Sequence, residues 1–257
     1  FIQTADIAFN SDETQVDWDG DGSADGSGTS GFSPIGNSTS NFSGEYDGGG
    51  HTIDNLYVNN SIDNTGLFGY MNNATIRNLG ITNASVTSSG NYSGALVGYA
   101  SGSSITNSYT SGSVSVGTGD YAGGFAGEIN STNVNQSFSD CTVTGGSRSG
   151  GFIGRMQSSS STTNCYSAGA VNVGDYGGGF VGIAYSSNII NCYSSSSLSG
   201  EGNDRGGFAG YEGTNVSTYS NVFWDTETSG QNTSAGGTGK TTAEMKDYNT
   251  FTDVASA

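Results

Sequence analysis

The chain has 257 residues, of which 44 are glycine, one is proline and 11% are charged, and its formal net charge is −17. So much glycine excludes a mainly helical protein, because each internal glycine costs about 1 kcal/mol relative to alanine in a helix. The acidic charge argues against nucleic acid as a partner, and no apolar run is long enough to span a membrane. An acidic surface with few lysines instead favours an extracellular setting and the binding of divalent cations.

The N-terminal region, residues 1–58, is irregular and is predicted to hold an entry strand, an acidic loop and the first coil of the repeat. Residues 1–9 are β-prone and predict a first strand. Oxygen-bearing side chains then occupy alternate positions of a glycine-containing stretch, at Asp17, Asp19, Asp21, Ser23 and Asp25. This pattern is typical of the first half of a Ca²⁺-binding loop, although Gly28 stands where such loops carry a bidentate glutamate. The stretch therefore predicts Ca²⁺ as a cofactor, and the alternative is an acidic, solvated surface loop.

The central region, residues 59–212, is an internal repeat. A small residue, two apolar residues and a glycine recur six times, and the closing glycines are 29, 29, 27, 28 and 28 residues apart. The copies lie at residues 66–69, 95–98, 124–127, 151–154, 179–182 and 207–210. A fixed period of this length is the signature of a repeat architecture.

A column of amide side chains shares this period. Asparagine or glutamine recurs in Ile-x-Asn-like segments, at Asn55, Asn78, Asn107, Gln136, Asn164, Asn191 and Asn221. Stacked amides can hydrogen-bond to one another, and asparagine tolerates left-handed backbone geometry. We interpret the column as a structural ladder that Gln136 interrupts.

An aromatic residue often stands two positions after this amide, and Gly80 is the exception. The aromatic residues are Tyr57, Tyr109, Phe138, Tyr166, Tyr193 and Phe223. Of these, Tyr109, Phe138, Tyr166 and Tyr193 would line up about 4.8 Å apart and could bind a glycan by stacking on its sugar rings. The alternative is an aromatic spine that packs only against itself.

Each repeat holds three short strand-forming segments. One carries the amide column, one carries the small-apolar-apolar-glycine motif, and the third carries alternating apolar residues such as Val114 and Val116. We therefore predict an all-β fold, a parallel β-helix (β-solenoid) of about 27–29 residues per coil. Cys165 and Cys192 share one column in consecutive coils, about 5 Å apart, which fits a disulfide bridge and equally a stack of buried thiols.

The C-terminal region, residues 213–257, ends the period. Thr241 or Thr242 is placed to begin a short helix that continues through Met245. The last coil of a solenoid needs a cover that buries its core and blocks edge-to-edge pairing. We predict that this region holds the last coil and a C-terminal cap, and that all three regions form one continuous domain.

These segments resemble the GLUG-motif repeat family of bacterial secreted and cell-surface proteins, named for its Gly-Leu-hydrophobic-Gly core. Residues 66–69 match that core directly, and residues 47–53, 223–230 and 241–246 are also similar to the family. The resemblance implies a secreted, adhesin-like surface protein, in a group that includes some immunoglobulin A peptidases. It transfers no catalytic residue to this chain.

Three functions are consistent with the sequence. The favoured one is a non-catalytic structural or adhesive module of a bacterial surface protein or extracellular filament, stabilised by Ca²⁺, whose partners are other segments of that protein or copies of itself in a fibre. The alternative is a module that binds glycans or surfaces through the aromatic column. A polysaccharide lyase or hydrolase is least favoured, because only six basic residues are available, and Arg155 and Arg205 lie outside the repeat columns.

Overall fold

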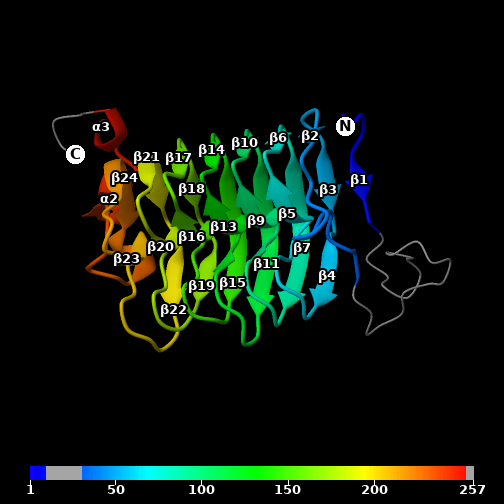
Figure 1. Cartoon of the computed structure of the whole chain (residues 1–257). Coiled ribbons are helices and arrows are strands. Elements are labelled where there is room, and N and C mark those ends of the chain that lie inside the picture. Colours follow the sequence, from blue (N-terminus) through cyan, green and yellow to red (C-terminus); the bar gives the residue numbers. More distant parts are fainter. Residues whose placement is uncertain (10–30, 253–257) are drawn as a thin grey trace.

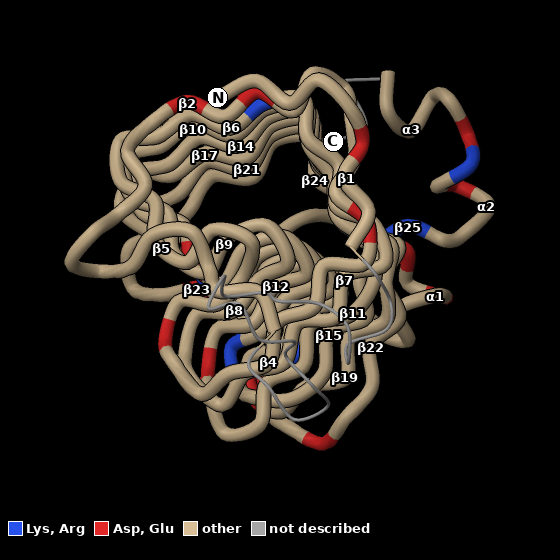
Figure 2. The backbone as a smooth tube through the Cα atoms, turned by 90° about the vertical axis from the view of Figure 1, so that its right-hand side faces the viewer, with Lys and Arg blue, Asp and Glu red and all other residues tan. Residues whose placement is uncertain are grey.

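The computed structural model describes residues 1–9 and 31–252, which form an all-β solenoid of stacked parallel strands (Figure 1). We use "rung" for one circuit of the chain around the solenoid. Tyr109 pairs with Phe138, and Tyr193 pairs with Phe223, so that a rung takes 27–30 residues. Seen along the axis, successive rungs overlie one another (Figure 2). The predicted fold class is therefore confirmed.

The small-apolar-apolar-glycine motif leads into a 6-stranded parallel sheet. Its strands are β5 (Phe68–Asn72), β9 (Val97–Ser101), β13 (Ala126–Asn130), β16 (Ile153–Gln157), β20 (Val181–Ala184) and β23 (Ala209–Glu212). The closing glycines let two rungs approach closely. A β-carbon on Gly127 would lie 2.4 Å from the carbonyl carbon of Tyr92, and one on Gly154 would lie 2.5 Å from that of Tyr121. Any larger residue would force the rungs apart.

The other faces of the solenoid belong to a 17-stranded sheet that bends at the amide column. Strands that lie before the bend are β2 (Glu45–Asp47), β6 (Thr75–Arg77), β10 (Ser104–Thr106), β14 (Asn133–Asn135) and β17 (Ser161–Thr163). Strands that lie after it are β3 (Thr52–Asp54), β4 (Tyr57–Asn60), β7 (Gly80–Ser88), β11 (Tyr109–Val116), β15 (Phe138–Thr144), β18 (Tyr166–Ser167), β19 (Ala170–Asn172) and β22 (Ser197–Ser199). Two strands continue through the bend, β21 (Asn188–Ser194) and β24 (Thr218–Asp225). A 2-stranded sheet of β8 (Ser93–Gly94) and β12 (Ala122–Gly123) precedes the motif.

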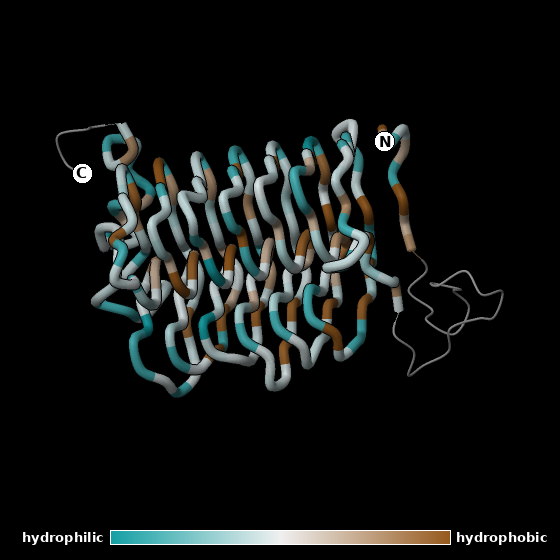
Figure 3. The backbone as a smooth tube through the Cα atoms, in the orientation of Figure 1, coloured by the Kyte–Doolittle hydropathy of each residue, from teal (hydrophilic) through white to brown (hydrophobic). Residues whose placement is uncertain are grey.

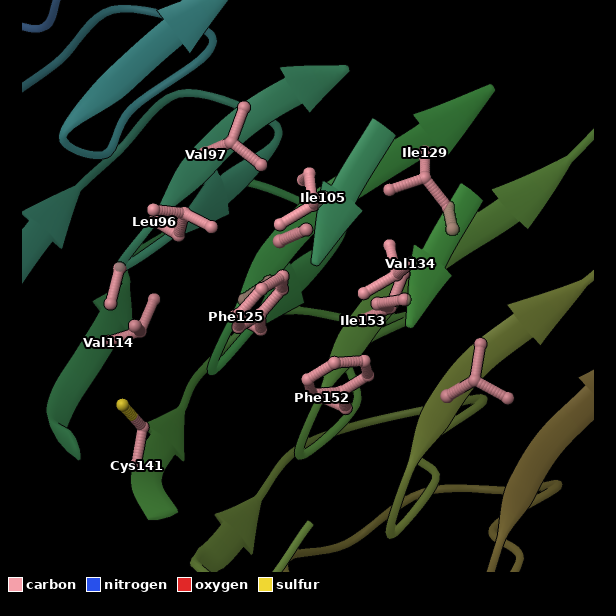
Figure 4. Close-up of a cluster of buried hydrophobic side chains, with 14 of the residues drawn as sticks. Leu96, Val97, Ile105, Val114, Phe125, Ile129, Val134, Cys141, Phe152 and Ile153 are labelled. Carbon is pink, nitrogen blue, oxygen red and sulfur yellow. The ribbon is translucent and has the colours of Figure 1, made fainter. Parts of the chain in front are cut away.

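The core consists of like residues stacked along the axis. Phe125, Phe152, Phe180 and Phe208 are fully buried, and the centroids of neighbouring rings are 4.6, 4.9 and 4.6 Å apart. Figure 4 shows the Phe125 and Phe152 rings on successive rungs among buried aliphatic side chains. Apolar segments recur at matching places from rung to rung (Figure 3). Each rung thus buries its apolar residues against the next one, and the fold depends on these contacts between neighbouring rungs.

The two ends of the solenoid are different. At the N-terminal end, β1 (Ile7–Ala8) pairs in parallel with β3. At the opposite end, β25 (Thr238–Lys240) pairs with β24, and three short helices follow or flank it, α1 (Thr226–Ser229), α2 (Thr242–Met245) and α3 (Tyr248–Thr252). Thr241 is the N-cap of α2 and forms a capping box with Glu244, which confirms the predicted start of that helix. None of the described helices is long and apolar enough to cross a membrane.

Asp225 holds this C-terminal segment together. Its carboxylate accepts hydrogen bonds from the backbone nitrogens of Glu227 and Thr228 at 3.0 Å, and from the Thr242 hydroxyl at 2.8–2.9 Å. Burial opposes ionisation of Asp225, but the hydrogen bonds from Thr228 and Thr242 outweigh it and lower the pKa of the carboxyl. One side chain therefore links the end of β24 to both α1 and α2.

Candidate functional site

The predicted amide column is hydrogen-bonded in two stretches, from Asn78 to Asn107 and from Asn164 to Asn221. Its residues have left-handed backbone geometry, with φ between 49° and 55° from Asn78 to Asn221. The amide of Asn107 donates to Asn78 at 2.8 Å, that of Asn191 donates to Asn164 at 3.2 Å, and that of Asn221 donates to Asn191 at 3.0 Å. Asn191 thus uses one donor and one acceptor along the axis and keeps another of each to offer elsewhere.

The ladder changes at Gln136, as the sequence predicts. The side-chain amide of Asn164 donates to Asn135 Oδ1 at 3.1 Å instead of reaching Gln136, and Asn135 donates to Gln136 at 3.4 Å. Gln136 keeps the left-handed backbone, with φ of 50°. The longer side chain therefore preserves the bend of the chain but shifts the amide contact by one residue.

The placement of Asn55 in this ladder is wrong. Asp54 pairs with Thr82, so Asn55 lies in register with Asn83, and both have positive φ. Asp47 pairs with Arg77, so the turn that follows Asp47 is in register with Asn78 and takes the place predicted for Asn55. The Asp47 carboxylate accepts a hydrogen bond from the Asn78 amide at 2.9 Å. The reason is an extra bend in these two rungs, which repeats Ile-x-Asn 28 residues apart at 53–55 and 81–83. By the same register, Tyr57 pairs with Ser85 and lies outside the aromatic column.

The four predicted aromatic residues are stacked along the axis, immediately after the amide ladder. The ring centroids of Tyr109, Phe138, Tyr166 and Tyr193 are 5.0, 4.7 and 5.0 Å apart, and each pair is within 4° of parallel. All four side chains are half-buried. Because each ring covers the face of its neighbour, the interior of this aromatic ladder presents ring edges and hydroxyls to solvent, and not ring faces.

Both ends of the aromatic ladder have distinct neighbours. At one end Tyr109 lies over Gly80, where a β-carbon would come within 2.5 Å of the ring, which explains why this position is glycine. At the other end Phe251 of α3 contacts Tyr193 with centroids 5.8 Å apart at 60°, and Phe223 with centroids 5.7 Å apart at 89°. The tilted Phe251 ring therefore ends the parallel stack without covering Tyr193 face to face.

A cavity of about 500 Å³ lies at this second end. Its walls combine amides, rings and two buried thiols, from Asn164, Asn191, Asn221, Tyr166, Tyr193, Phe223, Phe251, Cys165 and Cys192. A second cavity of about 310 Å³ shares Tyr193 and Phe251 with the first and is also lined by Asp225 and Lys246. The two ladders and the C-terminal cap thus meet at one hollow region of the described surface.

The cysteine column contains free thiols. Cys165 and Cys192 lie in consecutive rungs, both are buried, and each thiol contacts a backbone carbonyl two residues earlier at 3.2 Å. Burial raises the pKa of Cys165, and Cys141 is likewise free and buried. Of the two arrangements compatible with the sequence, the structure has the thiol stack.

A second aromatic cluster was not predicted. Tyr92 and Tyr121 stack with centroids 5.2 Å apart at 7°, and Tyr92 meets Tyr99 edge to face at 5.7 Å. The Arg155 guanidinium lies 4.4 Å from the centroid of Tyr121, and its nitrogens donate to the hydroxyls of Tyr121 and Tyr92 at 3.3 and 3.4 Å. Tyr92 and Tyr121 have φ of 61° and 64°, which is unusual for bulky residues.

The centre of this cluster is a buried ion pair. Glu128 is completely buried, and its carboxylate accepts from Arg155 Nε and from the Gln157 amide, each at 2.6 Å. Burial raises the pKa of the Glu128 carboxyl, and Arg155 opposes that rise. Burial also acts to lower the pKa of Arg155, but the adjacent carboxylate outweighs it and the pKa is raised. The ion pair holds the guanidinium against the stacked tyrosines, 4.4 Å from the centroid of Tyr121 and 5.6 Å from that of Tyr92.

A periodic signal for this cluster was present in the sequence. The residue after each closing glycine is large in the first four copies, and the residue six positions before the closing glycine is large in copies two to five. The two sets are Tyr70, Tyr99, Glu128 and Arg155, and Tyr92, Tyr121, Arg148 and Tyr176. Their residue types vary from copy to copy, so that only their spacing connects them.

The predicted Ca²⁺ ligands Asp17, Asp19, Asp21, Ser23 and Asp25 lie outside the described residues. Within residues 1–9 and 31–252, no three histidine, cysteine, aspartate or glutamate side chains gather as a metal site would require. The Ca²⁺ site stays a prediction.

Comparison with known proteins gives similarity in fold and a short similarity in sequence. No protein-family model matches the chain. A segment of 63 residues, 23% of this chain, is 48% identical to halomucin from Haloquadratum walsbyi, and it spans about 1% of the length of halomucin. The fold is similar to the crystal structure of a Bacteroides ovatus protein named a "putative immunoglobulin A1 protease", with a TM-score of 0.66 and 21% identity over 98% of this chain and 80% of that one. At this identity the structural likeness concerns the fold alone.

Proposed function

We propose that this chain is a non-catalytic structural and adhesive module of a secreted surface protein. The observation that carries the proposal is the alignment of equivalent side chains along one axis. Amides, surface rings and buried phenylalanines each form a ladder through consecutive rungs. A rod built in this way holds its length and presents one repeating face to its surroundings.

The sequence similarity to halomucin supports an extracellular location, because that name denotes a mucin, a class of extracellular polymers. The net charge of −17 also suits a solvated surface polymer, since like charges keep such chains apart. The resemblance to GLUG-motif surface proteins favours the same setting. The partners of the module would be further segments of the same protein or copies of itself in a fibre.

The ionisable residues favour a non-catalytic role over a polysaccharide lyase or hydrolase. Glu128, the carboxylate beside Arg155, is fully buried and committed to an internal ion pair. Burial raises the pKa of Tyr92, which touches the same guanidinium, whereas a tyrosine that acts as a base needs a lowered pKa. Arg205 donates to the backbone carbonyl of Gly200.

An adhesion assay in a flow chamber tests the proposal. Microspheres coated with the whole chain would pass over walls that carry a neutral polysaccharide, an acidic polysaccharide or albumin, with heat-unfolded chain as the control coating. We expect retention on polysaccharide above albumin, dependence on the folded state, and no release of sugar from the walls. Release of oligosaccharides would show an enzyme, and retention equal to albumin would refute the adhesive role.

A further inference from the structure

The stacked rings of the aromatic ladder limit where a ligand can bind. Along Tyr109, Phe138 and Tyr166 the ring faces cover one another at 4.7–5.0 Å, so a flat ligand cannot stack there without breaking the ladder. The parallel stack ends at Tyr193, and the cavity of about 500 Å³ at that end is lined by Tyr166, Tyr193, Phe223 and Phe251. This volume falls in the range of pockets that hold small ligands.

We propose that this cavity binds an uncharged pyranose unit of a glycan. The proposal rests on the adhesive role proposed above and assigns it a place and a ligand class. A pyranose carries apolar C–H groups on its faces and hydroxyls around its rim. The rings of Tyr193, Phe223 and Phe251 line one part of the cavity and suit the apolar faces.

The amide ladder supplies the matching polar groups. Asn164, Asn191 and Asn221 line the same cavity, and the backbone bends at φ of 53–55° fix where each side chain starts. The hydrogen bonds along the ladder use one N–H of Asn191 and one lone pair on its oxygen. A second N–H and a second lone pair stay available on that amide. Sugar hydroxyls both donate and accept, so a row of such amides at the spacing of neighbouring strands can pair with them.

Charge selects an uncharged sugar. The residues that line the cavity are asparagine, cysteine, tyrosine and phenylalanine, and none of them carries a carboxylate, ammonium or guanidinium group. A uronic or sialic acid would bring a carboxylate to a lining without a cationic side chain, in a protein whose net charge is −17. Two lysines lie near this lining without belonging to it: Lys240, with Nζ 5.7 Å from the centroid of the Phe223 ring, and Lys246, which lines the neighbouring cavity.

The experiment is an NMR titration of the whole chain with the methyl glycosides of glucose, galactose and mannose, and with glucuronic acid. We expect saturable shifts of the side-chain amides of Asn191 and Asn221 with at least one neutral glycoside. Tyr193→Ser should weaken binding at least about tenfold, because it removes a ring that contacts the sugar. Tyr109→Ser is the matched control, since it removes a ring of the same ladder far from the cavity and should leave the affinity unchanged.

Phe251→Ala is the second variant, because α3 lies outside the rungs and its loss should leave the solenoid folded. It should weaken glycoside binding without changing the far-UV circular dichroism spectrum. The proposal is overturned if no neutral glycoside gives a saturable shift, if glucuronic acid binds more tightly, or if Tyr109→Ser weakens binding as much as Tyr193→Ser. Attachment of coated microspheres that persists without glycoside binding would refute this site and leave the proposed module intact.

Discussion

The buried phenylalanine ladder provides the sharpest test of how this solenoid is stabilised. Phe152 and Phe180 are fully buried neighbours with centroids 4.9 Å apart, whereas Phe125 and Phe180 are separated by a whole rung. Each Phe→Ala substitution should lower the free energy of unfolding by about 3–5 kcal/mol, the usual cost of emptying a buried aromatic site. The pair Phe152→Ala and Phe180→Ala should cost less than the sum of the single changes by about 1 kcal/mol, since aromatic neighbours contribute about 0.5–1.5 kcal/mol beyond their buried area.

The pair Phe125→Ala and Phe180→Ala is the matched control. Two strand spacings separate these rings, about 9.6 Å, and sites so far apart are usually additive within about 0.5 kcal/mol. Guanidinium denaturation at 25 °C, followed by far-UV circular dichroism, would give the free energy of unfolding of each single and double variant. If both double variants differ from the sum of their single variants by the same amount, the claim that only adjacent rungs stabilise one another is refuted.

Three further changes test separate contacts. Glu128→Gln should lower the free energy of unfolding by about 3 kcal/mol because it leaves Arg155 partly buried without its partner, and adding Arg155→Met should recover most of that loss in the same denaturation assay. Asn164→Ala should be about 1 kcal/mol less stable than Asn164→Gly, because both lose the ladder contacts but only alanine is strained at φ of 55°; equal melting temperatures would contradict this. Because folding lowers the pKa of Asp225, its carboxylate stabilises the fold at pH values above 3.8, the usual pKa of aspartate, and this stabilisation is lost as the pH falls below that value. The melting temperature of Asp225→Asn should therefore fall less steeply than that of the parent below about pH 4.

Much of the fold could be predicted from residue columns, and the exceptions have physical causes. Asn107 and Phe152 stand in columns whose residue type is nearly constant, because identical side chains stack best on one another. Asn55 was misplaced because its rung contains two left-handed bends, and a short pattern alone does not say which bend is meant.

The cluster around Arg155 followed the period but not a residue type. Tyr92 and Tyr121 stack as like residues, but Arg155 attracts Tyr121 as cation and ring and Glu128 as base and acid, so the residue type changes from rung to rung. A search for a repeated letter misses such a change, whereas a search for a repeated spacing of large residues finds it. The cavity beside Tyr193 was also beyond prediction, because it depends on where α3 folds back against the last rungs.

A general consequence for solenoids follows from the two ladders. Where aromatic rings stack without interruption, their faces cover one another and are closed to a ligand, as the parallel rings of Phe138 and Tyr166 illustrate, whereas a stacked amide such as Asn191 keeps a donor and an acceptor. Recognition therefore belongs to the places where repetition stops. In this chain the aromatic ladder has two ends. At Gly80 the backbone packs directly against the Tyr109 ring, and at Tyr193 a cavity lies next to amides that have unused hydrogen-bonding groups. The second end alone combines free ring surface with hydrogen-bonding groups, which is why the binding site is expected there and not along the repeated face.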